Sequence, residues 1–279
     1  MRDFAGKVVV VTGAANGIGR EIARAFARRG ARLALADNDE AGLLAVKEEL
    51  AGMGVTVYAQ VVNVSLAVDV GDFCDSVYRE MGRVDVLCNN AGVAVAGDFE
   101  EMSLEDLSWV VDTNLWGVIC GCHFFYPRMI AQGGGGHIVN TASAGGLAPF
   151  VALAIYGCTK YGVVGLSETL RAEAALHGIG VSAICPGVIA TDIVLRSRIR
   201  STSARSTPDK LVTTMDKILK RRGYAPERVA LAAIRAVERN RGVVRVAPEA
   251  YAADWAHRLS RRAYGAVMAG AARLARKVL

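Results

Sequence analysis

Lys7-Val-Val-Val-Val-Thr12 runs directly into Gly13-Ala-Ala-Asn-Gly17-Ile-Gly19, and this stretch decides the fold. A short run of β-branched residues is typical of a strand that is buried on both faces. After the glycines, apolar residues recur at helical spacing over residues 20–29. In such a strand–turn–helix unit the glycines let the backbone approach a pyrophosphate, which the helix N-terminus attracts. We therefore expect a dinucleotide site here rather than an ordinary turn between a strand and a helix.

The next strand, over residues 31–36, predicts which dinucleotide binds. It ends at Asp37, 18 residues past Gly19 and close to the acidic position expected of such units. A carboxylate there accepts hydrogen bonds from the adenine-ribose hydroxyls and repels a 2′-phosphate. Neither Asn38 nor Asn16 supplies a compensating positive charge, so we predict NAD rather than NADP. The alternative is that Asp37 belongs only to a turn cluster.

Strands and helices alternate along the rest of the chain. This pattern predicts an α/β fold, a single doubly wound Rossmann domain over residues 1–248 with a parallel sheet of about seven strands. Residues 192–225 break the pattern and are expected to form a substrate lid, and residues 249–279 to form a C-terminal helical extension. The expected helices cover 41–50, 68–81, 104–130 and 156–176, and the later strands cover 55–62, 84–88, 137–141, 181–185 and 243–246.

Tyr156-Gly-Cys-Thr-Lys160 places a phenol and an ammonium four residues apart. On a helix these positions share a face, so both side chains can point into one cleft. A neighbouring cation favours the phenolate and lowers the pKa of the tyrosine, which suits a general acid or base. The alternative is a surface helix with one half-buried tyrosine and one solvated lysine.

Taken together, these motifs resemble those of the short-chain dehydrogenase/reductase family over about residues 5–248. The matching residues are Thr12-Gly13-x-x-x-Gly17-x-Gly19, Asn89-Asn90-Ala91-Gly92, Asn114, Ser143, Tyr156-x-x-x-Lys160, and Pro186-Gly187 followed by Thr191. The resemblance implies an oxidoreductase that transfers a hydride to or from nicotinamide, whose chemistry belongs to the cofactor. It also implies a homo-oligomer, a tetramer or dimer, built on the helices at 104–130 and 156–176.

The resemblance gives each catalytic residue a role. Tyr156 exchanges a proton with the substrate oxygen, and Ser143 orients that oxygen. Lys160 lowers the pKa of Tyr156 and binds the nicotinamide ribose, and Asn114 holds a water that extends a proton relay. The implied cofactor contacts are Gly13, Asn16, Gly17, Ile18, Gly19, Asp37, Asn63, Val64, Asn90, Ala91, Gly92, Tyr156, Lys160, Pro186, Gly187, Ile189 and Thr191.

Position 63 departs from the family pattern, because Asn63 stands where an aspartate is common. Its amide oxygen can still accept from the adenine amino group, so we expect weaker adenine binding at most. The four histidines have no partners at metal-ligand spacing and no metal is predicted; they are His123, His137, His177 and His257.

The segments expected to flank the substrate are residues 93–96, 145–153 and 188–195, which are mostly small and apolar. They favour an apolar secondary alcohol or ketone that is steroid-like, retinoid-like or long-chain. The arginines of residues 196–205 would suit a substrate that carries an anionic group, such as coenzyme A. The alternative is that they belong to a mobile, solvated lid. Two alternatives remain: an NADP-dependent 3-oxoacyl reductase, and a non-catalytic nucleotide-binding or scaffold protein.

Charge is distributed unevenly. Residues 1–191 carry 13 Lys and Arg against 20 Asp and Glu, a net of −7, and residues 192–279 carry 20 against 7, a net of +13. The basic residues lack an aromatic platform, so nucleic acid is not expected. The tail 263–279 is expected to form a helix with Tyr264, Val267 and Ala271 on its apolar face, and to dock on a partner subunit or lie on an anionic membrane.

The remaining composition indicates a cytoplasmic protein. No signal peptide is recognised at the N-terminus, and no uncharged apolar run reaches transmembrane length. The six cysteines lie in apolar segments without zinc or redox spacing and are expected to be reduced thiols.

Overall fold

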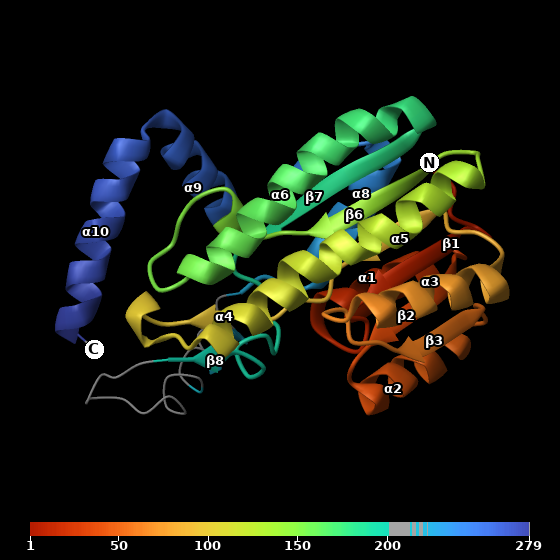
Figure 1. The fold of residues 1–279 in the computed structure, drawn as a ribbon, viewed down its shortest axis with the longest axis horizontal. Helices are drawn as coiled ribbons and strands as arrows, with labels where there is room; N and C mark the ends of the chain where they lie inside the picture. The colour runs from red at the N-terminus through yellow and green to blue at the C-terminus, as the bar shows by residue number, and fades with distance from the viewer. Residues whose placement is uncertain (201–212, 214–215, 218–219, 222, 279) are drawn as a thin grey trace.

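The fold is a seven-stranded sheet covered by helices on both faces. The computed structural model describes residues 1–200, 213, 216–217, 220–221 and 223–278 (Figure 1). Every pairing in the large sheet is parallel, and the strand order is β3-β2-β1-β4-β6-β7-β9. The predicted doubly wound Rossmann architecture is confirmed. The strands of this sheet are β1 Val8–Thr12, β2 Arg32–Asp37, β3 Val57–Val61, β4 Val86–Asn89, β6 Gly136–Thr141, β7 Ile179–Pro186 and β9 Val243–Val246.

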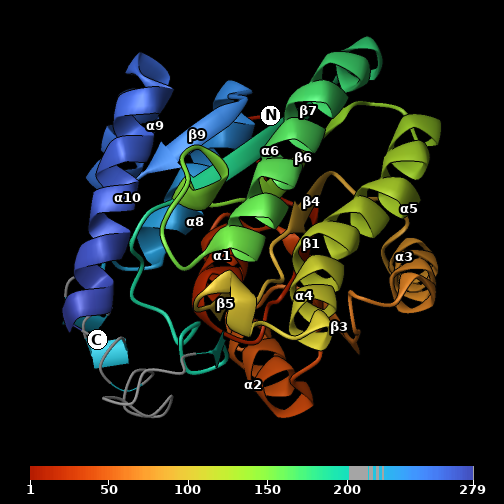
Figure 2. The same cartoon turned by 60° about the vertical axis from the view of Figure 1, so that its left-hand side comes forward.

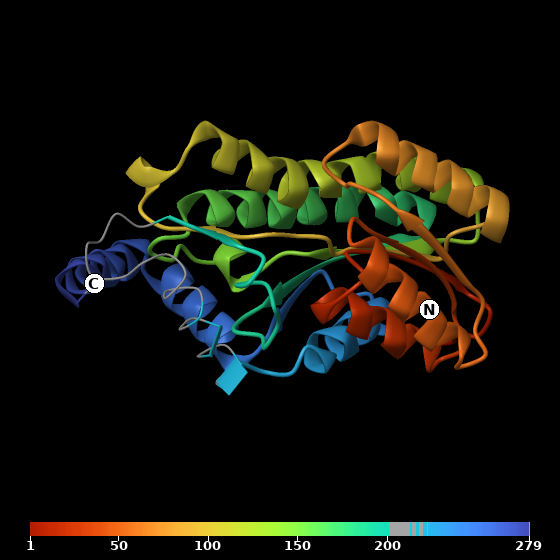
Figure 3. The ribbon, with the colours of Figure 1, turned by 90° about the horizontal axis from the view of Figure 1, so that it is seen from below.

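Polar and apolar residues do not alternate along β1, because helices cover both faces of the sheet. Val9 and Val11 face one cluster with α1, α2 and α8, whereas Val8 and Val10 face the other with α3, α5 and α6. Figure 3 shows α1 and α8 on the opposite side of the sheet from α3 and α5. The helices are α1 Gly17–Ala27, α2 Glu40–Ala51, α3 Ala67–Met81, α4 Leu104–Val111, α5 Gly117–Ala131, α6 Ala154–Ala174, α8 Glu227–Arg239, α9 Pro248–Leu259 and α10 Arg261–Val278.

The single helix predicted over residues 104–130 is wrong in one respect. A π-helical turn, Asp112–Trp116, separates α4 from α5. The wider turn carries Asn114, whose side chain is wholly buried. It bonds both backbone groups of Val93, with Val93 N donating at 2.8 Å and Asn114 Nδ2 donating to Val93 O at 2.9 Å. Amide pairing with a neighbouring loop therefore accompanies this break in the helix.

A second small sheet lies apart from the large one. β5 Val95–Ala96 pairs in parallel with β8 Arg198–Ile199, although about a hundred residues separate them in the chain. The sequence shows no strand pattern at either place. The segment 192–225, expected to form a lid, is therefore not irregular throughout. Its residues 201–212, 214–215, 218–219 and 222 lie outside the described part of the chain.

The C-terminal helices form an arm at the edge of the domain. α10 packs against α9, away from the large sheet (Figures 1 and 2). The expected apolar face of α10 is rotated: Tyr264 is half-buried, as are Met268 and Ala272, whereas Val267 is 63% exposed. The side chains beyond residue 273 lie outside the described part of the structure. Among the described residues, no helix is both long and apolar enough to cross a bilayer.

His137 makes the stability of this fold depend on pH. Its ring is 3% exposed, with Nε2 2.7 Å from Ser182 Oγ, and burial lowers its pKa to about 3. The unfolded chain binds this proton near pH 6.5, so stability is lost as pH falls from about 6.5 towards 3, by up to about 1.4 kcal/mol per pH unit. In urea unfolding, His137→Gln should flatten that dependence, whereas the exposed control His123→Gln should not. An unchanged dependence in His137→Gln would contradict this assignment.

Candidate active site

A cleft of about 630 Å³ opens beyond the carboxyl ends of the strands, where sites in such sheets are found. Every predicted cofactor-contact residue lines it, from Gly13 to Thr191. Ser143, Tyr156 and Lys160 line it as well. Asn114 is the exception among the predicted catalytic residues, since it is buried behind the wall. The sequence motifs, spread over some 180 residues, thus meet at one place.

The glycine turn forms a cradle in which the backbone segments lie too close together to admit a side chain. Gly13 has a φ of +65°, and a Cβ on Gly19 would lie 1.9 Å from the carbonyl oxygen of Gly13. Helix α1 begins at this point with no acidic residue in its first turn, and the side chain of Asn16 makes no cap. Its free N–H groups and partial positive charge suit the pyrophosphate of a dinucleotide.

Asn90 ties three strand ends together beneath this cradle. Its Nδ2 donates to Thr12 O at 3.1 Å and to Gly13 O at 3.2 Å, and Thr141 Oγ1 donates to its Oδ1 at 3.2 Å. The backbone N–H groups of Asn90 and Ala91 donate in turn to Thr12 Oγ1. β1, β4 and β6 are therefore fixed relative to one another where the cleft begins. The sequence motif included Thr12, but nothing in it indicated this use of Thr141.

Asp37 lies in the wall of the cleft and is 7% exposed. Its Oδ2 accepts from Ala15 N at 2.9 Å and its Oδ1 from Asp39 N at 3.0 Å. Each carboxylate oxygen retains a further acceptor site. Asn38 and Asn16 supply no positive charge, as expected, but Arg196 also lines the cleft and pairs with Asp39 Oδ2 at 3.0 Å. That arginine is remote in sequence, so no local pattern could reveal it.

Asn63 lines the cleft at the same end. Its Oδ1 accepts from Ser65 N at 3.1 Å and from Ser65 Oγ at 2.8 Å. The amide oxygen that was expected to meet adenine is therefore already used to hold its own turn. Because a carbonyl oxygen has two lone pairs, both are engaged by the protein.

Ser143, Tyr156 and Lys160 converge from β6 and α6. Ser143 follows β6 directly, and its Oγ accepts from Gly145 N at 3.1 Å. Lys160 is 4% exposed, donates to Thr141 O at 3.1 Å, and holds its Nζ 5.7 Å from the centroid of the Tyr156 ring. The shared helical face predicted from the sequence is thus present.

The electrostatics of this group differ from the prediction. Burial raises the pKa of Tyr156, opposed by a hydrogen bond with Ser143, whereas a lowered value was expected from Lys160. Burial also lowers the pKa of Lys160, to about 8. Desolvation disfavours both the phenolate and the ammonium, and it is the largest cause of both shifts in pKa.

The far end of the cleft is mostly apolar. Of the residues expected there, those that do not line it are Val95, residues 145–152, Ala190, Asp192 and Leu195. Trp109 and Ile199 line it although the sequence did not suggest them. The apolar residues at this end are Val93, Ala94, Ala96, Trp109, Leu153, Val188, Ile193, Val194 and Ile199.

The arginines proposed as an anionic handle are engaged elsewhere. Arg196 pairs with Asp39, and Arg198 and Arg200 both pair with Asp106. Arg205 lies outside the described residues. The three described arginines thus neutralise carboxylates of the protein itself. Among the described residues, no group of His, Cys, Asp and Glu side chains could hold a metal ion.

The C-terminal arm touches both loops that border the catalytic group. Glu249 Oε1 accepts from Val188 N at 2.5 Å, next to Gly187. His257 Nδ1 lies 3.0 Å from Leu147 O, and Tyr264 donates through its hydroxyl to Pro149 O at 3.1 Å. The arm therefore packs on its own domain rather than standing free.

Comparison with known proteins identifies the family. The profile described as short chain dehydrogenase matches residues 7–201, and the chain belongs to this family of oxidoreductases. The crystal structure of a short chain dehydrogenase/reductase from Burkholderia phymatum in complex with NAD superposes with a TM-score of 0.83 at 34% identity, covering 90% of this chain and 92% of that one.

Two curated relatives show the range of the similarity. The probable oxidoreductase EphD of Mycobacterium tuberculosis is 40% identical over 253 residues, which are 89% of this chain and 42% of that protein. The chain thus spans less than half the length of this relative. The D-threitol dehydrogenase of Mycolicibacterium smegmatis is 39% identical over 188 residues, 67% of this chain and 72% of that protein.

Proposed function

We propose that this protein is an NAD-dependent oxidoreductase that interconverts a secondary alcohol and a ketone on an apolar substrate. The observation that carries the proposal is the convergence of Ser143, Tyr156 and Lys160 in one cleft between the glycine cradle and the apolar end. A non-catalytic nucleotide-binding module would have no use for a buried lysine beside a phenol.

The residues of the cleft fit a nicotinamide dinucleotide. The open N-terminus of α1 and the carboxylate of Asp37 suit its pyrophosphate and adenine ribose. Pro186, Gly187, Ile189 and Thr191 line the same cleft and are proposed to meet its carboxamide. When bound, the cofactor would supply the hydride acceptor or donor.

Tyr156 is proposed to move the proton. In alcohol oxidation its oxygen takes the proton of the substrate hydroxyl, and in ketone reduction it returns that proton. Its raised pKa keeps the phenol protonated at neutral pH, which favours the reducing direction there, and oxidation should gain as pH rises. Ser143 would orient the substrate oxygen, and Lys160, still largely an ammonium below pH about 8, would stabilise the phenolate.

Asn114 is proposed to act from behind the wall. A Cβ on Gly92 would lie 3.2 Å from Asn114 Oδ1 and 3.5 Å from Lys160 Nζ, so these two groups flank Gly92 on the same side. Asn114 would hold the Val93 loop against α6 beside the lysine. The water relay implied by the family stays a prediction.

Tyr156→Phe tests the reaction with NAD and a panel of isopropanol, cyclohexanol, menthol and androsterone. Loss of the phenol oxygen should lower kcat by about 10²-fold or more while the Kd for NAD changes by less than about twofold. Tyr161→Phe is the matched control, since Tyr161 lies on the same helix, is 38% exposed and does not line the cleft. Retained turnover in Tyr156→Phe, followed by nicotinamide absorbance, would refute the assignment.

The cofactor preference is proposed to follow Asp37. NAD(H) should be used with a kcat/KM at least about tenfold above that for NADP(H), because a 2′-phosphate would meet the carboxylate. Asp37→Ala should narrow this ratio, and adding Asn38→Arg should narrow it further. Equal efficiency with both cofactors in the parent enzyme would contradict the proposal and point to Arg196 as the group that accepts the phosphate.

A homo-oligomer, dimer or tetramer, is proposed on the helices α4–α5 and α6. Large apolar side chains remain exposed there, with Trp116 46% and Tyr161 38% exposed. In light scattering, Trp116→Arg should lower the mass of the assembly, whereas the control Trp255→Arg, on the arm, should not. A monomeric parent at micromolar concentration would refute the oligomer, and dissociation by Trp255→Arg alone would move the interface to the arm.

A further inference from the structure

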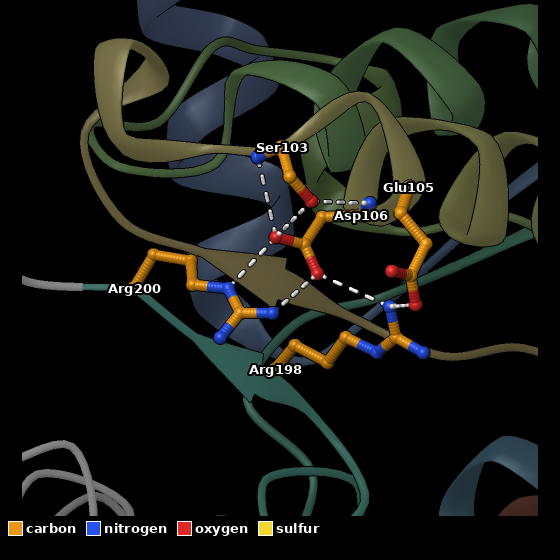
Figure 4. Close-up of polar contacts among 5 residues, drawn as sticks. All are labelled: Ser103, Glu105, Asp106, Arg198 and Arg200. Atoms are coloured by element: carbon orange, nitrogen blue, oxygen red, sulfur yellow. Dashed lines mark hydrogen bonds and ion pairs between the residues drawn. The ribbon is translucent and has the colours of Figure 1, made fainter.

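The carboxylate of Asp106 is wholly buried, yet it is surrounded by donors. Arg200 binds it through Nε and Nη2, both at 2.7 Å, and Arg198 through Nη1 at 3.1 Å. Ser103 donates through its N–H at 3.3 Å and its hydroxyl at 3.0 Å. Figure 4 shows the two guanidinium groups converging on this carboxylate. They and Ser103 hold its pKa well below its usual range, so the ion pairs persist at all ordinary pH values.

Capping alone does not require this arrangement. Asp106 closes the capping box of α4 with Ser103, for which a polar side chain at this position suffices. The two arginines come from more than ninety residues further along the chain. Their bonds therefore connect the start of α4 to a different segment.

That segment is the small sheet at the apolar end of the cleft. Arg198 N donates to Ala94 O at 3.1 Å and Arg200 N to Ala96 O at 2.8 Å, so the arginines flank the pairing of β8 with β5. The backbones approach so closely that a Cβ on Gly97 would lie 2.1 Å from Arg200 O.

The same residues carry part of the cleft wall. Ala96 and Ile199 line the cleft from the two short strands, and Ala94 lines it from the position just before β5. Trp109 lines it from α4, one turn beyond Asp106, and the guanidinium of Arg198 lies 4.3 Å from its ring centroid. A shift of the arginines would therefore move this wall.

We propose that Asp106 is a positioning residue for the substrate: through Arg198 and Arg200 it holds β8 on β5 and so preforms the outer wall of the apolar end. This inference rests on the proposed function for its kinetic consequence only. Residues 197–200 of the expected lid, which spans 192–225, are then a fixed wall. Two short strands have few hydrogen bonds of their own, and the ion pairs with the buried carboxylate of Asp106 add to them.

Asp106→Asn tests the proposal, because it keeps the size of the side chain and loses the charge that holds two guanidinium groups. Glu105→Gln is the matched control: Glu105 lies on the same helix and also pairs with Arg198 at 3.1 Å, but it is 81% exposed. The first measurement is amide hydrogen exchange at Arg198 and Arg200. Exchange should be faster by about tenfold or more in Asp106→Asn and unchanged in Glu105→Gln.

The second measurement is kinetic, with the panel alcohol that gives the highest kcat/KM. Asp106→Asn should raise its KM by about tenfold to a hundredfold, the effect of a wall misplaced by about 1 Å, while kcat and the Kd for NAD stay within about threefold. Arg200→Gln, at a half-exposed side chain that should leave folding intact, is expected to reproduce the effect, and Arg200→Lys to restore part of it.

The outcomes separate the two proposals. If amide exchange at Arg198 and Arg200 is unchanged in both Asp106→Asn and Arg200→Gln, the claim that Asp106 holds β8 on β5 is refuted, whatever the activity of the variants. Faster exchange without a change in KM would overturn its role in substrate positioning. A parallel loss of NAD binding would show general damage and also overturn it. If the parent oxidises none of the alcohols, the proposed function fails, and the exchange experiment still decides the structural claim.

Discussion

The hydrogen bonds of Asn90 are the interaction on which the site depends. One amide side chain bonds the carbonyl groups of Thr12 and Gly13 and receives the hydroxyl of Thr141. The cofactor cradle begins at Gly13, and Lys160 is anchored on the carbonyl of Thr141. The cradle and the catalytic group are therefore held in one frame by partly buried, hydrogen-bonded groups. Such a frame needs little rearrangement when a ligand arrives.

Burial sets the chemistry of the site as much as proximity does. Lys160 and Tyr156 lie on one helical face, as their spacing requires. Both are buried there, and the loss of water disfavours the charged form of each side chain. The protein on its own thus presents a neutral phenol and a lysine with reduced basicity. The positive charge of an oxidised nicotinamide would shift this balance in favour of the phenolate.

The sequence predicts what repeats locally. β1 lies between two helical layers, and this burial is visible in the sequence as an apolar run. The glycines of the motifs lie where backbones approach closely, and this too is visible in neighbouring residues. The π-helical turn at Asn114 leaves none, because its partner Val93 lies in another loop. Arg196 beside Asp39 and the pairing of β5 with β8 are likewise contacts between remote segments. The apolar face of α10 differs from the one expected, because the hydroxyl of Tyr264 donates to Pro149 O in a loop that is remote in sequence.

The contacts of Glu249, His257 and Tyr264 have a consequence for how the site is made during synthesis. All three come from residues that follow the last strand of the large sheet, β9. A nascent chain that has left the ribosome as far as residue 247 contains every motif of the cofactor cradle and the catalytic group. At that stage the loops at Val188, Leu147 and Pro149 still lack their hydrogen bonds to Glu249, His257 and Tyr264. These three hydrogen bonds can therefore form only after the helical arm has been translated, later than every strand of the large sheet.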